Sequence, residues 1–398
     1  MPKRILIVGA GVAGPALALA LQRSGAGVTV VERAPALRTG GQAVDFRGPV
    51  HRAVLERLGL WDAIHAERTR PSELVLLHPD GSVAATLPAV MMAGDVEILR
   101  GDLGRILYER TRDATTYRFG DHPIALCDRG DAVDVRFASG AEETYDYVVG
   151  ADGLHSSVRT LSSGDDPGSS SKEAARVLRH HGFRIATFAT ENLVGDLGAS
   201  MVYSVPGRAL CLSAHRHDAG RALLVYAGAP FGPERRDLEA QRRDLHATFA
   251  GVGWEAPRVL DSLDRASDLY VDAIATVRVP RYHRGRIVLL GDAAWGGTLG
   301  GQGTSLAVVG AWVLAGELAR SSSPDVAFKR FEATMRPYAT RCQAGAARAG
   351  GFFAPSTLTG VRLRNAAYAA LTSRWLAGFF EWLVKDAASD LALPDYAG

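Results

Sequence analysis

Three glycine-containing turns, each placed directly after a predicted strand, hold the residues of this chain that are best suited to chemistry. In the first, Gly9-Ala10-Gly11-Val12-Ala13-Gly14 follows the apolar run Ile5–Val8 and opens an Ala/Leu-rich helix that we expect to reach about Ser24. Glycines at this spacing permit a tight turn, close approach of a pyrophosphate to the backbone, and close packing of helix on strand. The pattern predicts a βαβ unit that binds a dinucleotide.

The end of the second predicted strand narrows the choice of dinucleotide. This strand is Val28–Val31, and the carboxylate of the next residue, Glu32, can accept hydrogen bonds from the hydroxyls of an adenosine ribose. A glutamate disfavours a 2′-phosphate at this place. The pattern therefore indicates tightly bound FAD or NAD and not NADP.

A second turn favours FAD over NAD. Arg286–Leu290 predicts a buried strand that ends at Gly291-Asp292, and a glycine-rich loop then leads into a long helix from about Gly303. An aspartate at such a strand end can bind a ribityl hydroxyl. The positive end of the helix can stabilise the negative charge of a reduced flavin.

A third turn has the same form. Asp152-Gly153 follows the strand-like Tyr147–Val149, and Ser156 and Arg159 come shortly after it. Three glycine/acid turns at strand ends in this order predict a bound FAD.

The elements that position these turns divide the chain into a mixed α/β part and a β-rich part. Strands in the α/β part alternate with helices, whereas the second part contains short strands typical of an antiparallel sheet. The polar stretch 162–172 is expected to be a surface loop. The predicted helices are Pro49–Leu60, Asp102–Arg112 and most of Arg330–Asp386. A hairpin is predicted in Ser72–Leu87, with its turn at Pro79-Asp80-Gly81. The other predicted strands are Val133–Phe137, Tyr145–Val149, Phe183–Phe188, Met201–Val205, Ala209–Ser213 and Ala222–Tyr226.

The chain resembles the single-component, FAD-dependent aromatic hydroxylases of the para-hydroxybenzoate hydroxylase type. Within this family it is most similar to the tetracycline-inactivating and polyketide-tailoring monooxygenases. The resemblance spans nearly the whole chain and rests on the opening glycine motif with Glu32-Arg33, the stretch Gly40–Asp45, Arg100 before Asp102-Leu103, Asp152-Gly153 and Gly291-Asp292.

The resemblance implies an α/β fold: a Rossmann-type, glutathione-reductase-like FAD-binding domain with an inserted β-sheet substrate domain and a helical C-terminus. We expect the FAD-binding domain to comprise residues 1–71, 98–176 and 283–345, the substrate domain 72–97 and 177–282, and the C-terminal helices 346–398.

The resemblance also implies roles for single residues. Glu32 and Arg33 would contact the adenosine half of FAD, Asp45 and Arg100 its diphosphate–ribityl region, and Asp292 the ribityl chain. Arg38 is a candidate contact for NADPH or NADH. No His or Cys stands in a flavin-attachment motif, so FAD is expected to be non-covalent. The full set of expected FAD-binding residues is Gly9, Gly11, Val12, Ala13, Gly14, Glu32, Arg33, Asp45, Arg100, Asp152, Gly291, Asp292, Gly301, Gln302, Gly303 and Thr304.

The chain departs from the family in the loop after Asp292. Trp295 replaces a histidine, a proline next to the flavin ring is missing, Ser305 replaces an asparagine, and Gly310-Ala311 stands where the family has Asp-Ala. The many glycines predict a loose loop. Trp295 is interpreted either as a cover for the edge of the flavin ring or as a core anchor beneath the loop.

The activity implied is hydroxylation of an aromatic or polyketide-like small molecule. NADPH or NADH would reduce the flavin, O₂ would add at C4a, and the hydroperoxide would transfer oxygen to the substrate. Tyr203 and His215 are candidates for deprotonating a phenol, and no His, Asp and Glu residues show metal-ligand spacing. Two alternatives remain open: a dehydrogenase, reductase or oxidase of the same fold, and a non-enzymatic FAD-binding protein.

Composition excludes several other classes of function. The net charge is +2 and both signs are interleaved, so neither nucleic acid nor an anionic membrane is an expected partner. The three cysteines show no metal or redox spacing, and no stretch is long and apolar enough to span a bilayer. We expect a cytoplasmic enzyme that is a monomer or a homodimer.

Overall fold

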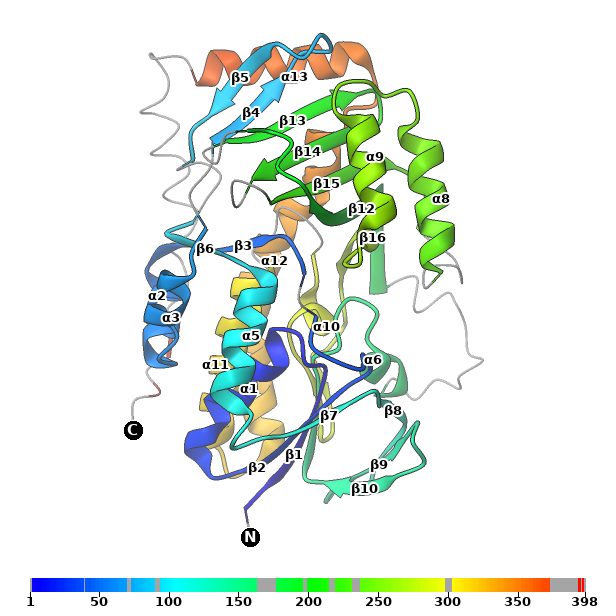
Figure 1. The fold of residues 1–398 in the computed structure, drawn as a ribbon. Coiled ribbons are helices and arrows are strands. Elements are labelled where there is room, and N and C mark those ends of the chain that lie inside the picture. Colours follow the sequence, from blue (N-terminus) through cyan, green and yellow to red (C-terminus); the bar gives the residue numbers. More distant parts are fainter. Residues whose placement is uncertain are drawn as a thin grey trace.

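Two β-sheets form the two halves of the molecule, and one long helix runs from one half to the other (Figure 1). The structure is a computed structural model. It describes residues 2–38, 40–69, 73–89, 94–162, 177–195, 199–214, 219–230, 237–297, 303–372, 393–394 and 396, without the side chains of 344–347.

The first sheet carries the glycine-containing turns. Within the described residues its strand order is β17-β18-β11-β1-β2-β7, parallel throughout except for the β17–β18 pair. A small antiparallel sheet, β10-β9-β8, joins the same hydrophobic core. The strands are β1 (Arg4–Val8), β2 (Gly27–Glu32), β7 (Thr116–Phe119), β8 (Pro123–Asp128), β9 (Val133–Phe137), β10 (Glu142–Tyr145), β11 (Tyr147–Gly150), β17 (His283–Arg284) and β18 (Ile287–Leu289).

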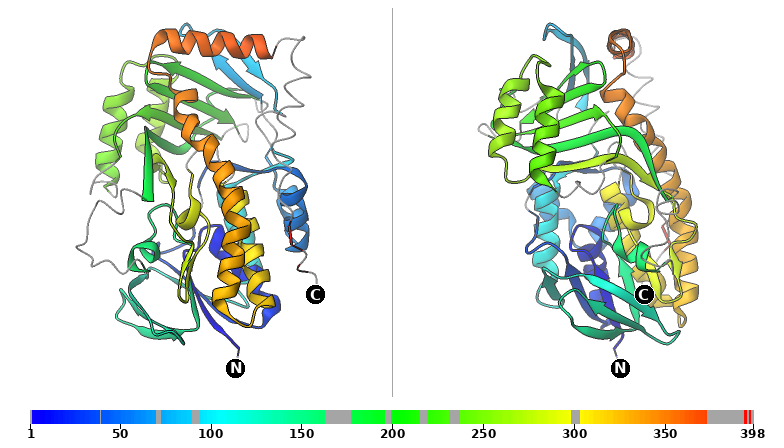
Figure 2. Two further views of the ribbon diagram at one scale, coloured as in Figure 1. Left: turned by 180° about the vertical axis from the view of Figure 1, so that it is seen from behind. Right: turned by 90° about the vertical axis from the view of Figure 1, so that its right-hand side faces the viewer.

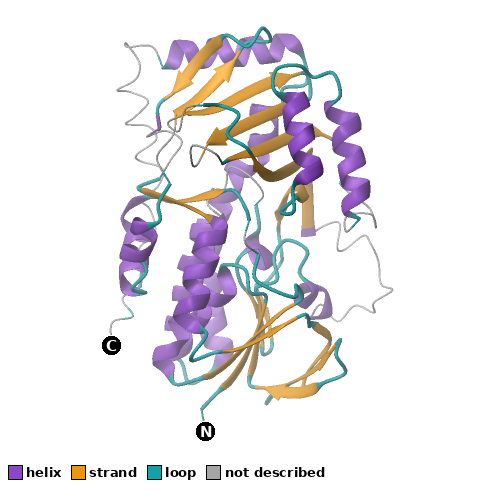
Figure 3. Ribbon diagram, in the orientation of Figure 1, coloured by secondary structure: helices purple, strands orange, loops and turns teal. Residues whose placement is uncertain are grey.

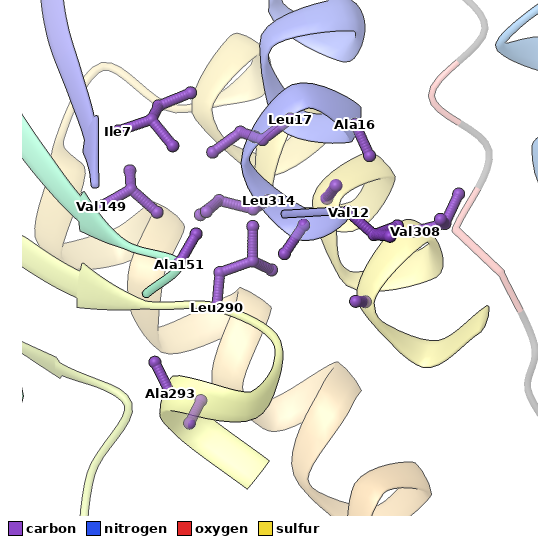
Figure 4. Close-up of a cluster of buried hydrophobic side chains, with 14 of the residues drawn as sticks. Ile7, Val12, Ala16, Leu17, Val149, Ala151, Leu290, Ala293, Val308 and Leu314 are labelled. Carbon is purple, nitrogen blue, oxygen red and sulfur yellow. The ribbon is translucent and has the colours of Figure 1, made fainter. Parts of the chain in front are cut away.

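Apolar contacts lock the first sheet to its helices (Figure 4). Leu17 of α1 (Ala13–Leu21) and Leu314 of α11 (Gly303–Arg320) are buried together with Ile7 and Val149 of the neighbouring strands β1 and β11. Strands buried on both faces read as continuous apolar runs, which is why Ile5–Val8 was recognisable in the sequence. This packing fixes the loop between β1 and α1.

The second sheet has the order β16-β12-β15-β14-β13-β4-β5 within the described residues, and its pairs are antiparallel except β13–β4. Helices α8 (Leu238–Phe249) and α9 (Ala256–Arg265) cover one face (Figure 3). The strands are β4 (Glu73–Leu77), β5 (Val83–Leu87), β12 (Leu178–Thr190), β13 (Ala199–Val205), β14 (Arg208–Ala214), β15 (Gly220–Ala227) and β16 (Tyr270–Val277).

The other face of the second sheet turns towards the first sheet and α12 (Pro324–Phe353). Phe188 and Leu224 belong to the core under α8 and α9, whereas Ile185 and Ile274 pack on the end of α12. Because side chains alternate along a strand, Thr187, Tyr270 and Asp272 share the face of Ile185 and Ile274. We call this face the inner face.

Helix α12 and a short ribbon connect the halves. Helix α12 packs on α11 below and on β12 and β16 above (Figure 2). The two-stranded ribbon of β3 (Ala43–Phe46) and β6 (Val96–Leu99) lies between the halves. The remaining helices are α2 (Gly48–Arg57), α3 (Trp61–Ala66), α5 (Arg100–Thr111), α6 (Ser157–Ser162), α10 (Asp292–Trp295) and α13 (Leu358–Leu371); a 3-10 turn, Gln22–Ser24, ends α1.

The α/β fold class is confirmed, and most predicted strands and helices are present with small changes of boundary. The hairpin at Pro79-Asp80-Gly81 joins the second sheet as β4 and β5. The helical region predicted from Arg330 contains the end of α12, which stops at Phe353, and α13, which begins after Pro355, a residue that disfavours continuation of a helix. Residues 373–386 of the predicted region lie outside the described residues. The predicted boundary at 345/346 falls inside α12. The sequence reading missed α8, α9 and β16.

Candidate functional site

The first glycine turn is shaped by close backbone approaches. Gly9 has φ +112°, and a Cβ there would collide with the carbonyl oxygen of Ala151; a Cβ on Gly14 would collide with the carbonyl oxygen of Gly9. Two of the three motif glycines are therefore required by packing. At Gly11, by contrast, the atom closest to an added Cβ is Nη2 of Arg100, at 3.8 Å.

The N-terminus of α1 is open to an anion. Val12 stands at the N-cap without a side-chain cap, and the first turn contains no acidic residue. Uncapped N–H groups and the helix dipole favour a phosphate at this position. The Arg100 guanidinium adds a positive charge beside Gly11.

Glu32 is held in position for a ribose. Its Oε2 accepts a hydrogen bond from the Ala10 N–H at 2.8 Å, and its Oε1 accepts one from the Ala34 N–H at 2.9 Å. These bonds tie the end of β2 to the glycine turn. The carboxylate is partly exposed, so its remaining lone pairs face solvent and remain available for hydroxyl donors.

Asp292 lies in an enclosed place without a hydrogen-bond donor among the described residues. Burial raises the pKa of Asp292, the charge of Arg100 opposes this shift, and the charge of Asp272 adds to it. Gly291 has φ +64°, and an added Cβ there would lie 3.0 Å from the Cβ of Ala13, so the Gly-Asp turn packs directly on α1. Among the described residues the Asp292 carboxylate has no hydrogen-bond donor and the Arg100 guanidinium has no ion-pair partner, which suits both for the hydroxyls and phosphates of FAD.

The Asp152 side chain caps a helix in the structure. Its Oδ1 accepts from the Ser156 hydroxyl at 2.5 Å, and its Oδ2 accepts from the Ser157 N–H at 2.6 Å, the Ser157 hydroxyl at 2.8 Å and the Val158 N–H at 3.1 Å. The side chain is thus engaged in capping α6, which the sequence reading did not foresee.

Arg159 connects this cap to the Gly-Asp turn. Its guanidinium donates to the carbonyl oxygen of Ala293 at 2.9 Å and to that of Leu154 at 2.7 Å. The loop after β11 therefore braces α10, on which Asp292 stands.

Asp45 and Arg100 lie towards opposite ends of the short β3–β6 ribbon. Asp45 forms an ion pair with Arg47 at 3.2 Å and lies opposite Glu97 in the β3–β6 pair, whereas the backbone of Arg100 bonds Gln42 at the other end of the ribbon. The Arg100 side chain thus reaches the glycine turn beside Gly11, whereas the Asp45 carboxylate is paired with Arg47.

The remaining predicted site residues lie in the core, at the surface or outside the described residues. Tyr203 donates to the carbonyl oxygen of Pro79 at 3.1 Å and stacks on Trp254 in the core under α8 and α9, so it cannot reach the inner face. Trp295 is 2% exposed and packs against Tyr282 and Phe331, which supports the core-anchor interpretation. Gly303 and Thr304 begin α11, Arg33 and Arg38 are exposed, and His215, Gly301 and Gln302 lie outside the described residues.

The structure reveals a polar cluster that the sequence reading missed. Asp272 accepts hydrogen bonds from Tyr270 Oη at 3.0 Å and from the Ala273 N–H, and its Oδ1 lies 3.0 Å from His155 Nε2. His155 stands between Asp152 and Ser156 in the sequence, so the third glycine/acid turn already contained one member of this cluster. Tyr270 and Asp272 lie on the inner face, which only the tertiary fold defines.

A pocket of ≈ 610 Å³ opens beside the inner face. Asp268 and Arg221 form a nearly buried ion pair in its wall, and Arg265 has no ion-pair partner in the described part of the chain. The pocket is lined by Gly40, Ala189, Thr190, Glu191, Arg221, Ser262, Arg265, Ala266, Ser267 and Asp268.

The described residues form neither a metal site nor a membrane-spanning helix. They contain no group of His, Cys, Asp and Glu side chains arranged to hold a metal ion. They also contain no helix with the length and apolar character needed to cross a membrane.

Comparisons with known proteins agree with this geometry. A family model described as "FAD binding domain" matches residues 3–341. The chain is 31% identical to the FAD-dependent monooxygenase asL4 of Sarocladium schorii, over 100% of this chain and 99% of that protein. It is 32% identical to a flavin-dependent monooxygenase of Legionella longbeachae, over 84% and 85% respectively.

Solved structures give the same result. The crystal structure of tetracycline destructase Tet(55) matches with a TM-score of 0.81 and 31% identity, over 99% of both chains. That of Tet(51) matches with a TM-score of 0.82 and 27% identity, over 100% of both chains.

Proposed function

Since the chain belongs to the FAD-binding-domain family of flavin-dependent monooxygenases, we propose that it uses NADH or NADPH and dioxygen to hydroxylate an aromatic or polyketide-like small molecule. The observation that carries this proposal is a row of groups suited to FAD: the partly exposed Glu32 carboxylate, the uncapped N-terminus of α1, and Asp292 and Arg100, whose side chains have no ion-pair partner among the described residues.

These residues would hold FAD. Glu32 would bind the ribose, the N–H groups of Val12 and Ala13 the pyrophosphate, and Asp292 the ribityl chain. When bound, FAD supplies the electron transfer and the activation of dioxygen. The protein contributes position, charge and exclusion of water.

The inner face of the second sheet is the proposed substrate surface. It carries the polar side chains Thr187, Arg221, Tyr270 and Asp272 beside apolar ones such as Leu223, and it faces the Arg100 and Asp292 side of the first sheet. Such a mixture suits a flat apolar molecule with a few hydroxyl or carbonyl groups. Sheet residues 72–97 and 177–282 would accordingly form the substrate domain.

The reductant would approach near Gly40. Arg38 is exposed two residues before Gly40, which lines the pocket that also contains Arg265. Arg221 of this pocket is paired with Asp268, whereas Arg265 has no ion-pair partner among the described residues and would bind a phosphate of a nicotinamide dinucleotide together with Arg38. Arg38 and Arg265 are the proposed contacts.

The test is oxygen incorporation by the purified FAD-bound protein. The protein is mixed with NADH or NADPH, isotopically labelled dioxygen, and in turn 4-nitrophenol, salicylate and tetracycline, and the products are analysed by mass spectrometry. We expect a hydroxylated product that contains one labelled oxygen atom. Oxidation of the nicotinamide without labelled product from any compound would indicate a reductase or oxidase, and a flavin that neither nicotinamide reduces would indicate a binding protein.

A further inference from the structure

Helix α10 is a single turn whose two end residues have different surroundings. Asp292 begins α10, and Trp295, three residues later, ends it. Leu290 before the turn and Ala293 in α10 belong to the same buried cluster as Leu314 of α11 (Figure 4). The position of the Asp292 carboxylate therefore depends on how α10 packs on its neighbours.

Two glycines on one face of α11 receive the two ends of α10. An added Cβ on Gly303 would lie 3.4 Å from Oδ1 of Asp292, and one on Gly310 would lie 2.8 Å from Cη2 of Trp295. Residues seven apart in a helix share a face and are about two turns from each other. The beginning of α11 thus meets Asp292, and the same face meets Trp295 further along.

The indole of Trp295 has little room to move away from Gly310. Its ring centroid lies 5.2 Å from that of Tyr282 and 5.9 Å from that of Phe331 in α12. The main-chain carbonyl oxygen of Trp295 accepts a hydrogen bond from Gln343 at 2.9 Å. Because protein interiors are close-packed, a methyl group on Gly310 would force the indole, and α10 with it, to shift.

Packing, and not hydrogen bonding, holds the ring of Trp295. Its Nε1 is buried without a hydrogen-bond partner among the described residues. An aromatic side chain that gains no hydrogen bond in an enclosed place contributes through its volume and shape. Trp295 is therefore a spacer between α10, α11 and α12.

We propose that Trp295 and Gly310 form a size-matched pair that positions the Asp292 carboxylate for the ribityl chain of FAD, an inference that rests on the role that the proposed function gives to Asp292. In this arrangement neither member of the pair contacts FAD. Both act through α10, and because hydrogen bonds weaken steeply outside a narrow range of distance and angle, a small shift of α10 weakens the contact of Asp292. Both positions are departures from the family pattern, and the contact between them explains why the two occur together.

Three variants separate this positioning role from the stability of α11. Gly310→Ala introduces the collision with Trp295, and since alanine is the better helix former, any loss comes from that collision and not from the helix itself. Trp295→Phe removes volume from the same pair without a collision, and the double variant combines the smaller ring with the added methyl group. Gly351→Ala is the matched control, because Gly351 also lies inside a helix, α12, but an added Cβ there meets nothing within 4 Å in the described part of the chain.

The experiment is calorimetric titration of the FAD-free parent and variants with FAD and, separately, with ADP, which contains the adenosine and phosphates of FAD but no ribityl chain. We expect Gly310→Ala to weaken FAD binding about tenfold and to leave ADP affinity within about twofold of the parent. Trp295→Phe should also weaken FAD binding and spare ADP, and the double variant should recover most of the FAD affinity. In an Asp292→Asn background, Gly310→Ala should add less than about twofold, because the contact through which it acts is already lost. Gly351→Ala should match the parent.

Equal losses of affinity for FAD and ADP in Gly310→Ala would overturn the inference, because they indicate a general disturbance of the fold. So would unchanged FAD affinity in both single variants, or a loss in Gly310→Ala that adds in full to that of Asp292→Asn. Where Gly310→Ala does not fold, Trp295→Phe and the double variant decide by the same criteria. FAD binding that does not depend on Asp292 would overturn the role of Asp292 and this inference with it, whereas absence of labelled product in the oxygen experiment would overturn hydroxylation alone.

Discussion

Replacing Asp152 by alanine distinguishes the capping role seen in the structure from the cofactor contact that the family resemblance implied. The substitution removes four hydrogen bonds at the start of α6. The hydroxyls of Ser156 and Ser157 can rotate to other partners. The N–H groups of Ser157 and of the buried Val158 are left without an acceptor, and each costs about 1 kcal/mol. The expected loss is about 2 kcal/mol of unfolding free energy, at the upper end for a lost N-cap.

The assay combines two measurements on the same variants. Urea unfolding of the FAD-free protein reports stability, and fluorescence titration with FAD reports affinity. Asp152→Ala should lose stability with FAD affinity changed by less than about tenfold, since one lost charge-assisted contact to FAD would cost at least that much. Asp152→Asn keeps a capping oxygen and is the control, with most of the stability retained. A large loss of FAD affinity at unchanged stability would refute the capping argument.

Four further substitutions test the site and its surroundings. Asp292→Asn should weaken FAD binding about tenfold to a hundredfold yet stabilise the FAD-free protein at neutral pH, because burial raises the pKa of the folded carboxyl and ionising it costs stability as the pH rises; a less stable FAD-free variant would contradict this. Glu32→Ala should weaken FAD binding by about 2–3 kcal/mol in a fluorescence titration, and unchanged affinity would show that Glu32 holds only the glycine turn. Burial lowers the pKa of His51 to about 4, so the unfolded chain takes up this proton first and stability should fall as the pH drops from about 6.5 to about 4. His51→Asn should show a smaller fall in urea unfolding across that range, and an equal fall in both proteins would argue against the neutral buried imidazole. Trp295→Phe should leave the visible spectrum of bound FAD unchanged, because Trp295 packs in the core; a shifted spectrum would place the indole beside the flavin.

The parts of the site that could be predicted are those in which local sequence alone determines the geometry. Gly9 and Gly14 are recognisable because no other residue fits their close backbone approaches. Glu32 and Asp292 end buried parallel strands, and the carboxyl ends of such strands meet at one edge of a sheet.

The rest depended on tertiary structure. Asp152 looks like a cofactor ligand in the motif, but the serines that follow it let the same carboxylate cap a helix. Tyr203 stands on a strand with apolar residues on both faces, so the alternation of polar and apolar side chains could not show which face is inner. Tyr270 and Asp272 come from β16, whose neighbour in the sheet, β12, lies far away in sequence.

The side chain of Gln343 in α12 is hydrogen-bonded to both β16 and α10. Its side-chain amide donates to the carbonyl oxygen of Val277, at the end of β16, at 2.6 Å and to that of Trp295, at the end of α10, at 2.9 Å. A hinge motion that swung the second sheet away from the first would break one of these buried bonds and leave a carbonyl oxygen unsatisfied. Strand β16, which carries Tyr270 and Asp272, and the turn with Asp292 are therefore expected to move as one rigid unit, and substrate entry to depend on smaller displacements of surface segments.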